Sequence, residues 1–292
     1  MSHERWLQDA QAPIDKPRVV FQGTAGSFSE SASYAYFGNM SQAFGLPSFK
    51  DAIEALVAGQ ADYAILPIEN SSTGAITEVY DLIADYPVCV VGERIIEITQ
   101  NLLALPGADL QGITTVYSHP QGLFQSKDFL TNHSLQGVPY NDTAMAAEMV
   151  AKKGDPSLAA IASARAAQAY GLNILVPHVN FSETNQTRFF VLRTVPECNP
   201  KQNKVSLVFK TPHKPGALFD ALRYFSNGHY DMTRIESRPV PGKPWEYAFY
   251  IDLMGSCSDS FFIGTLNRVR EATVDYHFLG AYASAQEKET IA

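Results

Sequence analysis

The sequence predicts an α/β protein followed by a separate unit of βαββαβ order, and three observations lead to this prediction. Strand and helix patterns alternate from residue 18 to about residue 194, as in a mostly parallel sheet. The segment 195–204 (VPECNPKQNK) holds two prolines and two asparagines without periodicity, which is typical of a linker. After it the order of elements becomes that of a ferredoxin-like unit, and a length of 292 residues also favours two domains.

Hydrophobic periodicity and end signals define the individual elements. Residues 18–22 (RVVFQ) form an apolar strand, the loop GTAGS follows, and the spacing of apolar residues predicts a helix over 28–37. Ser48 is an N-cap, and Gly59 a stop, for the next helix. The other elements expected in the first part are strands at 62–67, 113–117, 158–162, 174–176 and 187–194, an extended stretch at 88–104, and helices at 75–84, 120–132, 143–153 and 163–170. The second part is expected to contain strands at 205–210, 230–239, 246–254 and 274–283, with helices at 217–227 and 259–272.

Composition excludes several classes of protein. The formal net charge is −8 and no run of Lys or Arg stands out, so nucleic acid is not an expected partner. Three widely spaced cysteines form neither a disulfide framework nor a metal-binding pattern. The N-terminus lacks the apolar segment of a secretory signal, and no stretch of about 18 or more apolar residues occurs. We therefore expect a cytoplasmic protein without a membrane partner or a metal.

Polar side chains gather where predicted strands end, which is where open α/β sheets bind ligands. In GTAGSFSESA (23–32), glycines precede a helix start, where free backbone N–H groups attract anions, although a plain strand-to-helix turn is the alternative. Helix capping is the alternative explanation for the three clusters that lie between residues 67 and 150. It explains Asp142 most clearly, whereas Glu69 and Asn70 are harder to explain as caps. The stretch NQTRFFVL (185–192) puts polar groups at the start of an apolar strand, where they need hydrogen-bond partners or a ligand. The clusters between these two are PIENSSTG (67–74), SHPQGLFQS (118–126) and NDTAMAAEMV (141–150).

Together these segments resemble the prephenate dehydratases that carry a C-terminal ACT regulatory domain. The match also includes AAIASARAAQAYGL in the first part and KPGALFDAL and IESRP in the second, in the family's order. The resemblance implies two α/β subdomains around a cleft over residues 18–195, similar to periplasmic solute-binding proteins, and an ACT domain over residues 204–285. Only about 17 residues precede the first strand, so the N-terminal chorismate mutase domain of some members is not expected.

The family reaction converts prephenate to phenylpyruvate in phenylalanine biosynthesis, with loss of water and carbon dioxide and without a cofactor. Because the ring becomes aromatic, the enzyme has mainly to orient the substrate and to hydrogen-bond the leaving hydroxyl. By resemblance, Thr187 is the donor to the leaving oxygen, and Asn70 and Gln125 are the other residues tied to catalysis, since they bind or orient the substrate. Arg188 is adjacent to Thr187, and neighbours on a strand point to opposite faces. A structural role is therefore the alternative to substrate binding for Arg188. The other residues expected at the substrate are Gly26, Ser27, Glu69, Ser71, Ser118, His119, Arg188 and Phe189.

The resemblance also implies feedback regulation by L-phenylalanine at an interface between two ACT domains, and hence a homodimer or homotetramer. Asp231 stands where the family usually has Asn, Gly122 where it commonly has Ala, and Ser126 where it commonly has Cys. Two alternatives remain: an arogenate dehydratase, whose substrate has an amino group in place of the keto group, and a non-catalytic amino-acid sensor with a solute-binding cleft. The residues expected to bind phenylalanine are Gly216, Ala217, Leu218, Asp231, Glu236, Ser237, Arg238 and Pro239.

Overall fold

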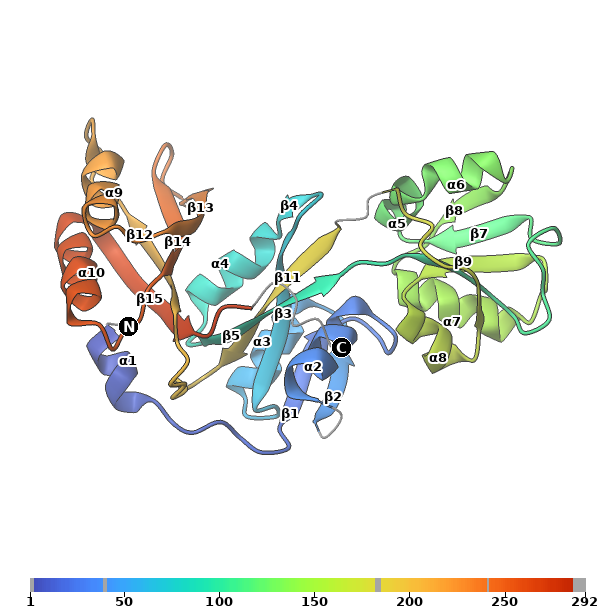
Figure 1. Ribbon diagram of the computed structural model, residues 1–292, viewed down its shortest axis with the longest axis horizontal. Helices are drawn as coiled ribbons and strands as arrows, with labels where there is room; N and C mark the ends of the chain where they lie inside the picture. Colours follow the sequence, from blue (N-terminus) through green and yellow to red (C-terminus); the bar gives the residue numbers. More distant parts are fainter. Residues whose placement is uncertain (1–2, 39–40, 182–184, 241, 286–292) are drawn as a thin grey trace. The chain divides into compact units, whose positions relative to one another are not determined.

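The computed structural model describes residues 3–38, 41–181, 185–240 and 242–285, and this chain divides into two compact units (Figure 1). Unit 1 comprises Met1–Asp15, Thr77–Glu93 and Phe190–Ala292, and unit 2 comprises Lys16–Ile76 and Arg94–Phe189. Strands β5 (Cys89–Glu97) and β11 (Gln186–Arg193) continue from one unit into the other. Among the described residues, no helix combines the length and the apolar character that crossing a membrane requires.

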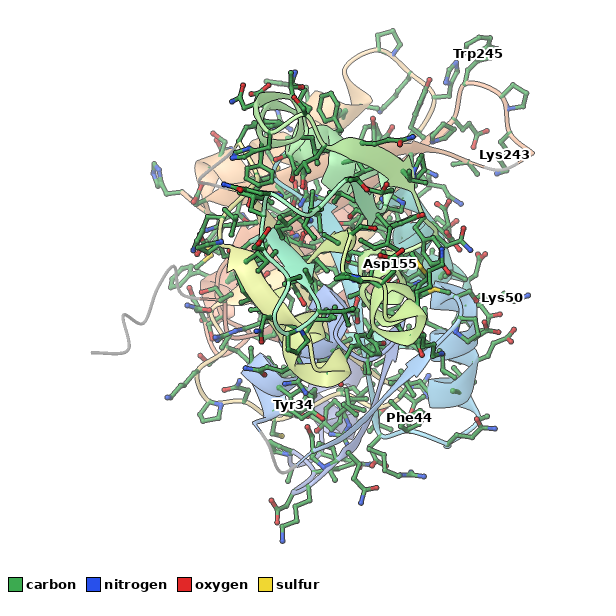
Figure 2. All side chains as sticks on the ribbon, turned by 90° about the vertical axis from the view of Figure 1, so that its right-hand side faces the viewer. Tyr34, Phe44, Lys50, Asp155, Lys243 and Trp245 are labelled. Atoms are coloured by element: carbon green, nitrogen blue, oxygen red, sulfur yellow. The ribbon has the colours of Figure 1, made fainter. Side chains whose placement is uncertain are left out.

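Unit 1 contains the predicted ferredoxin-like arrangement. Its elements are α1 (His3–Asp9), α4 (Thr77–Asp85), β12 (Lys204–Lys210), α9 (Ala217–Asn227), β13 (Met232–Pro239), β14 (Tyr247–Met254), α10 (Ser260–Ala272) and β15 (Val274–Tyr282). The last four strands form an antiparallel sheet in the order β13-β14-β12-β15, which confirms the βαββαβ prediction. The loop between β13 and β14 carries Lys243 and Trp245, and Trp245 is 80% exposed (Figure 2).

Two contacts join this sheet to β5 within unit 1. The Lys204 Nζ atom lies 3.0 Å from each carboxylate oxygen of Glu93, and both side chains are buried. Gly280 on β15 has no side chain, and a β-carbon at this position would lie 1.9 Å from the Val90 carbonyl oxygen. Glycine is therefore required where β15 approaches the backbone of β5.

The first sheet of unit 2 positions the polar loops that follow its strands. Its elements are β1 (Arg18–Gln22), α2 (Phe28–Phe37), β2 (Gln42–Leu46), α3 (Phe49–Val57), β3 (Tyr63–Asn70) and β4 (Gly74–Ala75). The strand order is β2-β1-β3-β11-β5, and β4 pairs with the end of β3. Ser48 and Asp51 form a capping box at the start of α3, as the N-cap prediction requires.

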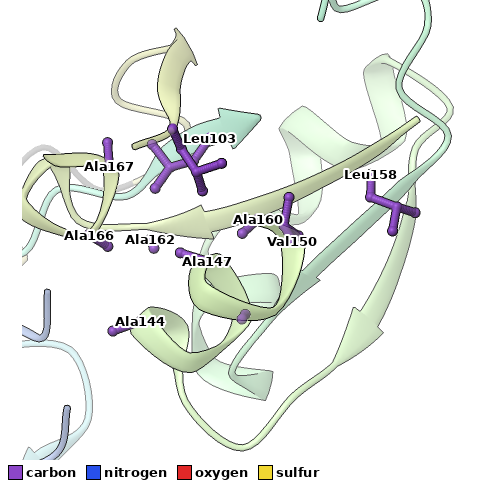
Figure 3. Close-up of a cluster of buried hydrophobic side chains, with 11 residues drawn as sticks. Leu103, Ala144, Ala147, Val150, Leu158, Ala160, Ala162, Ala166 and Ala167 are labelled. Atoms are coloured by element: carbon purple, nitrogen blue, oxygen red, sulfur yellow. The ribbon is translucent and has the colours of Figure 1, made fainter. Parts of the chain in front are cut away.

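The second sheet of unit 2 is covered by helices on both faces. Its elements are β6 (Asn101–Ala104), β7 (Thr115–Ser118), α5 (Pro120–Gln125), α6 (Lys127–Asn132), β8 (Gln136–Pro139), α7 (Thr143–Lys153), β9 (Leu158–Ala162), α8 (Ala164–Tyr170) and β10 (Asn173–Val176). The order is β10-β6-β9-β7-β8, so β9 is central. Ala160 and Ala162 pack in the cluster that α7 and α8 cover, where small side chains allow a close approach (Figure 3). Ala159 and Ile161 pack in a second cluster that includes Leu130 of α6.

The predicted α/β class with two sheet subdomains and a C-terminal βαββαβ unit is confirmed, with corrections in detail. The single helix expected over 120–132 is wrong, because it breaks at Ser126 into α5 and α6. The second sheet of unit 2 is mixed, since β6 is antiparallel to both β9 and β10, whereas β7 is parallel to β8 and β9. In the first sheet, β1 is parallel to both β2 and β3, as predicted. The strands β2 and β8 were missed because they are largely exposed and lack the apolar signal of a buried strand.

Candidate active site

The ends of two neighbouring strands carry a network of polar side chains. Asn70 ends β3, and Thr187 is the second residue of β11, the next strand of the sheet. The Asn70 Nδ2 atom lies 2.9 Å from Thr187 Oγ1, 2.9 Å from Asn185 Oδ1 and 3.2 Å from the Gln186 carbonyl oxygen. Three acceptors therefore surround one amide nitrogen, whose two hydrogens they share.

Backbone groups determine which way the Asn70 amide points. The N–H groups of Ser72 and Thr73 donate to Asn70 Oδ1 at 2.9 and 3.1 Å. Because a backbone N–H only donates, this oxygen cannot exchange places with the amide nitrogen. The nitrogen thus faces Thr187, whose hydroxyl oxygen accepts its hydrogen bond. The hydroxyl hydrogen of Thr187, which is 7% exposed, is left to donate to another group.

Ser71 fastens the loop after β3 to the start of β11. The Ser71 N–H donates to the Gln186 carbonyl at 2.8 Å, and the Gln186 N–H donates to Ser71 Oγ at 2.9 Å. This reciprocal pair holds Thr187 in register with Asn70. Ser71 therefore positions the strand, and its contact with the substrate stays a prediction.

Glu69 and Arg188 carry opposite charges beside the Asn70–Thr187 pair. The Arg188 Nε atom lies 3.7 Å from Glu69 Oε2, and the side chains are 11% and 37% exposed, respectively. Both residues were expected at the substrate, but the structure brings them together, so each offsets the charge of the other. Phe189, also expected there, is 1% exposed and lies in the core beside Phe190.

Two N–H groups of the GTAGS loop, those of Gly26 and Ser27, are bonded to protein groups. The Gly26 N–H donates to Glu30 Oε2 at 2.8 Å, and the Ser27 N–H donates to the Thr24 carbonyl at 3.2 Å while the Ser27 hydroxyl caps α2. These two N–H groups are therefore used within the protein, which agrees with the alternative interpretation of the loop as a plain strand-to-helix turn. Glu30 also pairs with Arg165 of α8 at 2.6 Å.

Gly26 is a glycine because α8 lies against the loop. Its φ is +83°, and a β-carbon there would lie 2.7 Å from the Ala166 Cα atom. The Ser163 hydroxyl donates to the Gly26 carbonyl at 2.6 Å, and the Tyr170 hydroxyl donates to the Ala25 carbonyl at 2.8 Å. The loop thus joins the first sheet of unit 2 to α8.

The three residues predicted after β7 have different surroundings. The buried Ser118 hydroxyl donates to the Ile161 carbonyl at 2.7 Å, and the exposed His119 accepts from the Gln121 N–H at 3.2 Å as the cap of α5. Both side chains therefore serve the sheet and the helix. Gln125 is 4% exposed, and in the described part of the chain its side-chain amide bonds to no protein group, so it is the one of the three with donors to offer a ligand.

Gly122, the departure from a common Ala, makes room for Ser118. A β-carbon on Gly122 would lie 2.6 Å from the Ser118 hydroxyl oxygen. An alanine would therefore force that hydroxyl, and its bond to β9, to shift.

A cavity of about 590 Å³ lies at the start of α9 in unit 1. It is lined by Gly216, Ala217 and Leu218, three of the residues expected to bind phenylalanine, together with aromatic side chains that include Trp245. Another expected residue, Arg238 of β13, pairs with Asp81 of α4 at 2.8 Å. Glu236 lies 3.6 Å from Arg234, and the Asp231 carbonyl accepts from the Met254 N–H at 2.8 Å. Ser237 and Pro239 also lie on β13.

A family model described as prephenate dehydratase matches residues 19–197. The chain belongs to the prephenate dehydratase family. This family membership confirms the resemblance inferred from the motifs. The matched residues run from Val19 in β1 to beyond the end of β11, and they include Asn70 and Thr187.

Known proteins resemble the chain over most of its length. It is 35% identical over 292 residues to arogenate dehydratase/prephenate dehydratase 1, chloroplastic, of Arabidopsis thaliana, with 94% of this chain and 74% of the relative covered. The prephenate dehydratase of Arthrobacter aurescens in complex with L-Phe is 30% identical, with a TM-score of 0.84 over 94% of this chain and 92% of that one. A structure described as GqqA, a novel type of quorum quenching acylase, is 29% identical, with a TM-score of 0.85 over 91% of this chain and 98% of that one.

Proposed function

We propose that this chain converts prephenate to phenylpyruvate and that Thr187 hydrogen-bonds the leaving hydroxyl. The observation that carries the proposal is the bond from Asn70 Nδ2 to Thr187 Oγ1 at 2.9 Å. Because the Thr187 oxygen accepts this bond, its own hydrogen points away from Asn70 and is available to a substrate oxygen. Accepting the bond also polarises the Thr187 O–H group, which makes it a better donor.

The reaction needs such a donor and no strong nucleophile. The electron pair of the bond to the ring carboxylate moves into the ring as carbon dioxide departs, and the ring C–O bond breaks. The leaving hydroxyl develops negative charge, which the Thr187 hydrogen bond stabilises, and it takes up one proton from solvent to leave as water. Aromatisation supplies the driving force, so positioning is the main contribution of the protein.

Amide groups are the proposed holders of the substrate carboxylates. Gln125 is buried with its side-chain amide uncommitted, and uncharged donors of this kind bind carboxylates without a basic patch. The Glu69–Arg188 pair sets the local charge beside Thr187, since Arg188 is 11% exposed and adjacent to Thr187 in the sequence. Gly26, Ser27, Ser118 and His119 are proposed to shape the site by holding its loops.

We further propose that residues 18–195 form the dehydratase domain and that residues 204–285 form an ACT domain that binds L-phenylalanine. The cavity at Gly216–Leu218 and the L-Phe complex of the Arthrobacter aurescens relative support this proposal. Phe219 and Trp245 line the cavity and are 68% and 80% exposed, which suits burial against a second copy of the chain. The protein is thus proposed to be a cytoplasmic homodimer or homotetramer.

The decisive experiment offers the purified protein three substrates. Prephenate is expected to give phenylpyruvate, and arogenate is the alternative because the Arabidopsis relative carries both names. An N-acyl amide is the third substrate, because the GqqA structure is described as an acylase. Faster turnover of arogenate or of the amide than of prephenate would overturn the proposed substrate.

A further inference from the structure

Asn185 holds a buried amide nitrogen without a protein partner. Its Oδ1 atom accepts from Asn70 Nδ2 at 2.9 Å and from the Ser72 hydroxyl at 3.4 Å. Its Nδ2 atom makes no hydrogen bond to the described residues, although Asn185 is only 1% exposed. The amide therefore uses its acceptor fully and leaves both donor hydrogens unused.

The orientation of the Asn185 amide follows from backbone N–H groups, which can only donate. The backbone N–H groups of Ser72 and Thr73 fix Asn70 Oδ1, so Asn70 Nδ2 faces Asn185 and must meet its oxygen. Rotating the Asn185 amide would set two donors against each other. The unused nitrogen is thus a consequence of the network and not a choice between equivalent assignments.

An unmet donor beside Thr187 points to a ligand. Asn185 Oδ1 and Thr187 Oγ1 both lie 2.9 Å from the same nitrogen, so they are less than twice that distance apart. Buried donors in folded proteins are nearly always bonded, because leaving one unpaired is costly. An acceptor that arrives with the substrate would satisfy this one.

We propose that Asn185 is a substrate-binding residue whose Nδ2 group donates to an acceptor oxygen of the keto acid, either a carboxylate or the keto oxygen. This inference rests on the proposed function. It assigns Asn70 a positioning role, because one amide orients both Thr187 and Asn185. The substrate thereby meets two donors, the Thr187 hydroxyl and the Asn185 amide.

The test replaces the donor while keeping the acceptor. Asn185→Asp retains an oxygen toward Asn70 and removes both unused hydrogens, so at neutral pH the KM for prephenate is expected to rise about 10- to 100-fold. As pH falls, the introduced carboxyl gains an O–H donor, and the ratio of variant to wild-type kcat/KM should recover. Comparison with wild type at each pH isolates the effect of the introduced carboxyl from that of the neighbouring charged side chains, Glu69 and Arg188. Asn185→Ala, which cannot regain a donor, is expected to lose affinity at every pH.

A matched control distinguishes ligand binding from a structural role. Asn101 is also a buried amide of unit 2, but its Nδ2 atom donates to the Thr99 and Ala162 carbonyls, both at 3.3 Å. Asn101→Asp should therefore lower the melting temperature more than Asn185→Asp does, with a smaller effect on KM. If the wild type is active and both Asn185 variants keep its KM, the inference about Asn185 is overturned and the proposed function is not. An inactive wild type would instead refute the proposed function.

The substrate pair identifies the acceptor. If the keto oxygen accepts, Asn185→Asp shifts selectivity toward arogenate, whose ammonium pairs with the new carboxylate. If a carboxylate shared by both substrates accepts, both KM values rise alike. Either pattern supports a donor at Asn185.

Discussion

Replacing Asn70 by Asp puts an acceptor oxygen in place of the amide donor that orients Thr187. The variant keeps the oxygen that accepts from Ser72 and Thr73, and it sets a second oxygen against the three acceptors now 2.9 to 3.2 Å from Asn70 Nδ2. Two N–H donors are lost and buried acceptors are left unmet, so the free energy of unfolding is expected to fall by about 2–4 kcal/mol. The Thr187 hydroxyl would then turn to donate to the new carboxylate instead of to the leaving group. We expect kcat to fall by about 10²- to 10⁴-fold, the contribution of a proton donor.

Steady-state kinetics with prephenate and urea denaturation measure the two effects. Thr73→Val is the control, because it removes only a 3.3 Å hydroxyl contact and keeps the backbone N–H bond, so a change below about 0.5 kcal/mol is expected. Adding Thr187→Val to Asn70→Asp should reduce kcat no further, because both changes remove the same donor. A kcat for Asn70→Asp within tenfold of wild type would refute this account of the network.

Three further predictions concern stability, reactivity and regulation. Lys204→Met removes the cation that lies 3.0 Å from the buried Glu93 carboxylate and should cost about 3–5 kcal/mol by urea denaturation, whereas adding Glu93→Leu should recover most of the loss. Burial raises the pKa values of Cys89 and Cys257 to about 12, so a thiol reagent at neutral pH should label only the exposed Cys198 in the folded protein; labelling of all three without unfolding would contradict this. Asp81→Asn removes the partner of Arg238 and should weaken inhibition by L-phenylalanine several-fold while prephenate turnover persists; unchanged inhibition would separate that ion pair from the regulation.

The sequence predicted the bounds of those helices that begin at a capping residue and end at a glycine. The helix Thr143–Lys153 begins at the Asp142 cap and ends at Gly154 in the left-handed conformation, and its predicted bounds are confirmed. The break at Ser126 carries neither Gly nor Pro, so no local signal announced it. The helix α1 was missed because its anchor is distant in sequence: Trp6 is fully buried against Phe278, with ring centroids 5.8 Å apart.

The site shows the same division between local and distant information. Motifs identified Thr187 and Asn70, but their hydrogen bond spans 117 residues and no spacing rule reveals it. The same motifs made Ser118 and His119 candidates, although a strand carbonyl and a helix N-terminus use their side chains. The sequence leaves the polar start of NQTRFFVL open between hydrogen-bond partners and a ligand, because the unbonded nitrogen of Asn185 follows only from the orientation of Asn70.

The most direct test of the central claim compares Thr187→Val with Thr187→Ser. Valine keeps the shape of threonine and removes the hydroxyl, whereas serine keeps the hydroxyl that accepts from Asn70. With prephenate, the valine variant is expected to lose about 10²- to 10⁴-fold in kcat and the serine variant less than about tenfold. Equal kcat values for wild type and Thr187→Val, in a folded protein that turns over prephenate, would contradict the role assigned to Thr187.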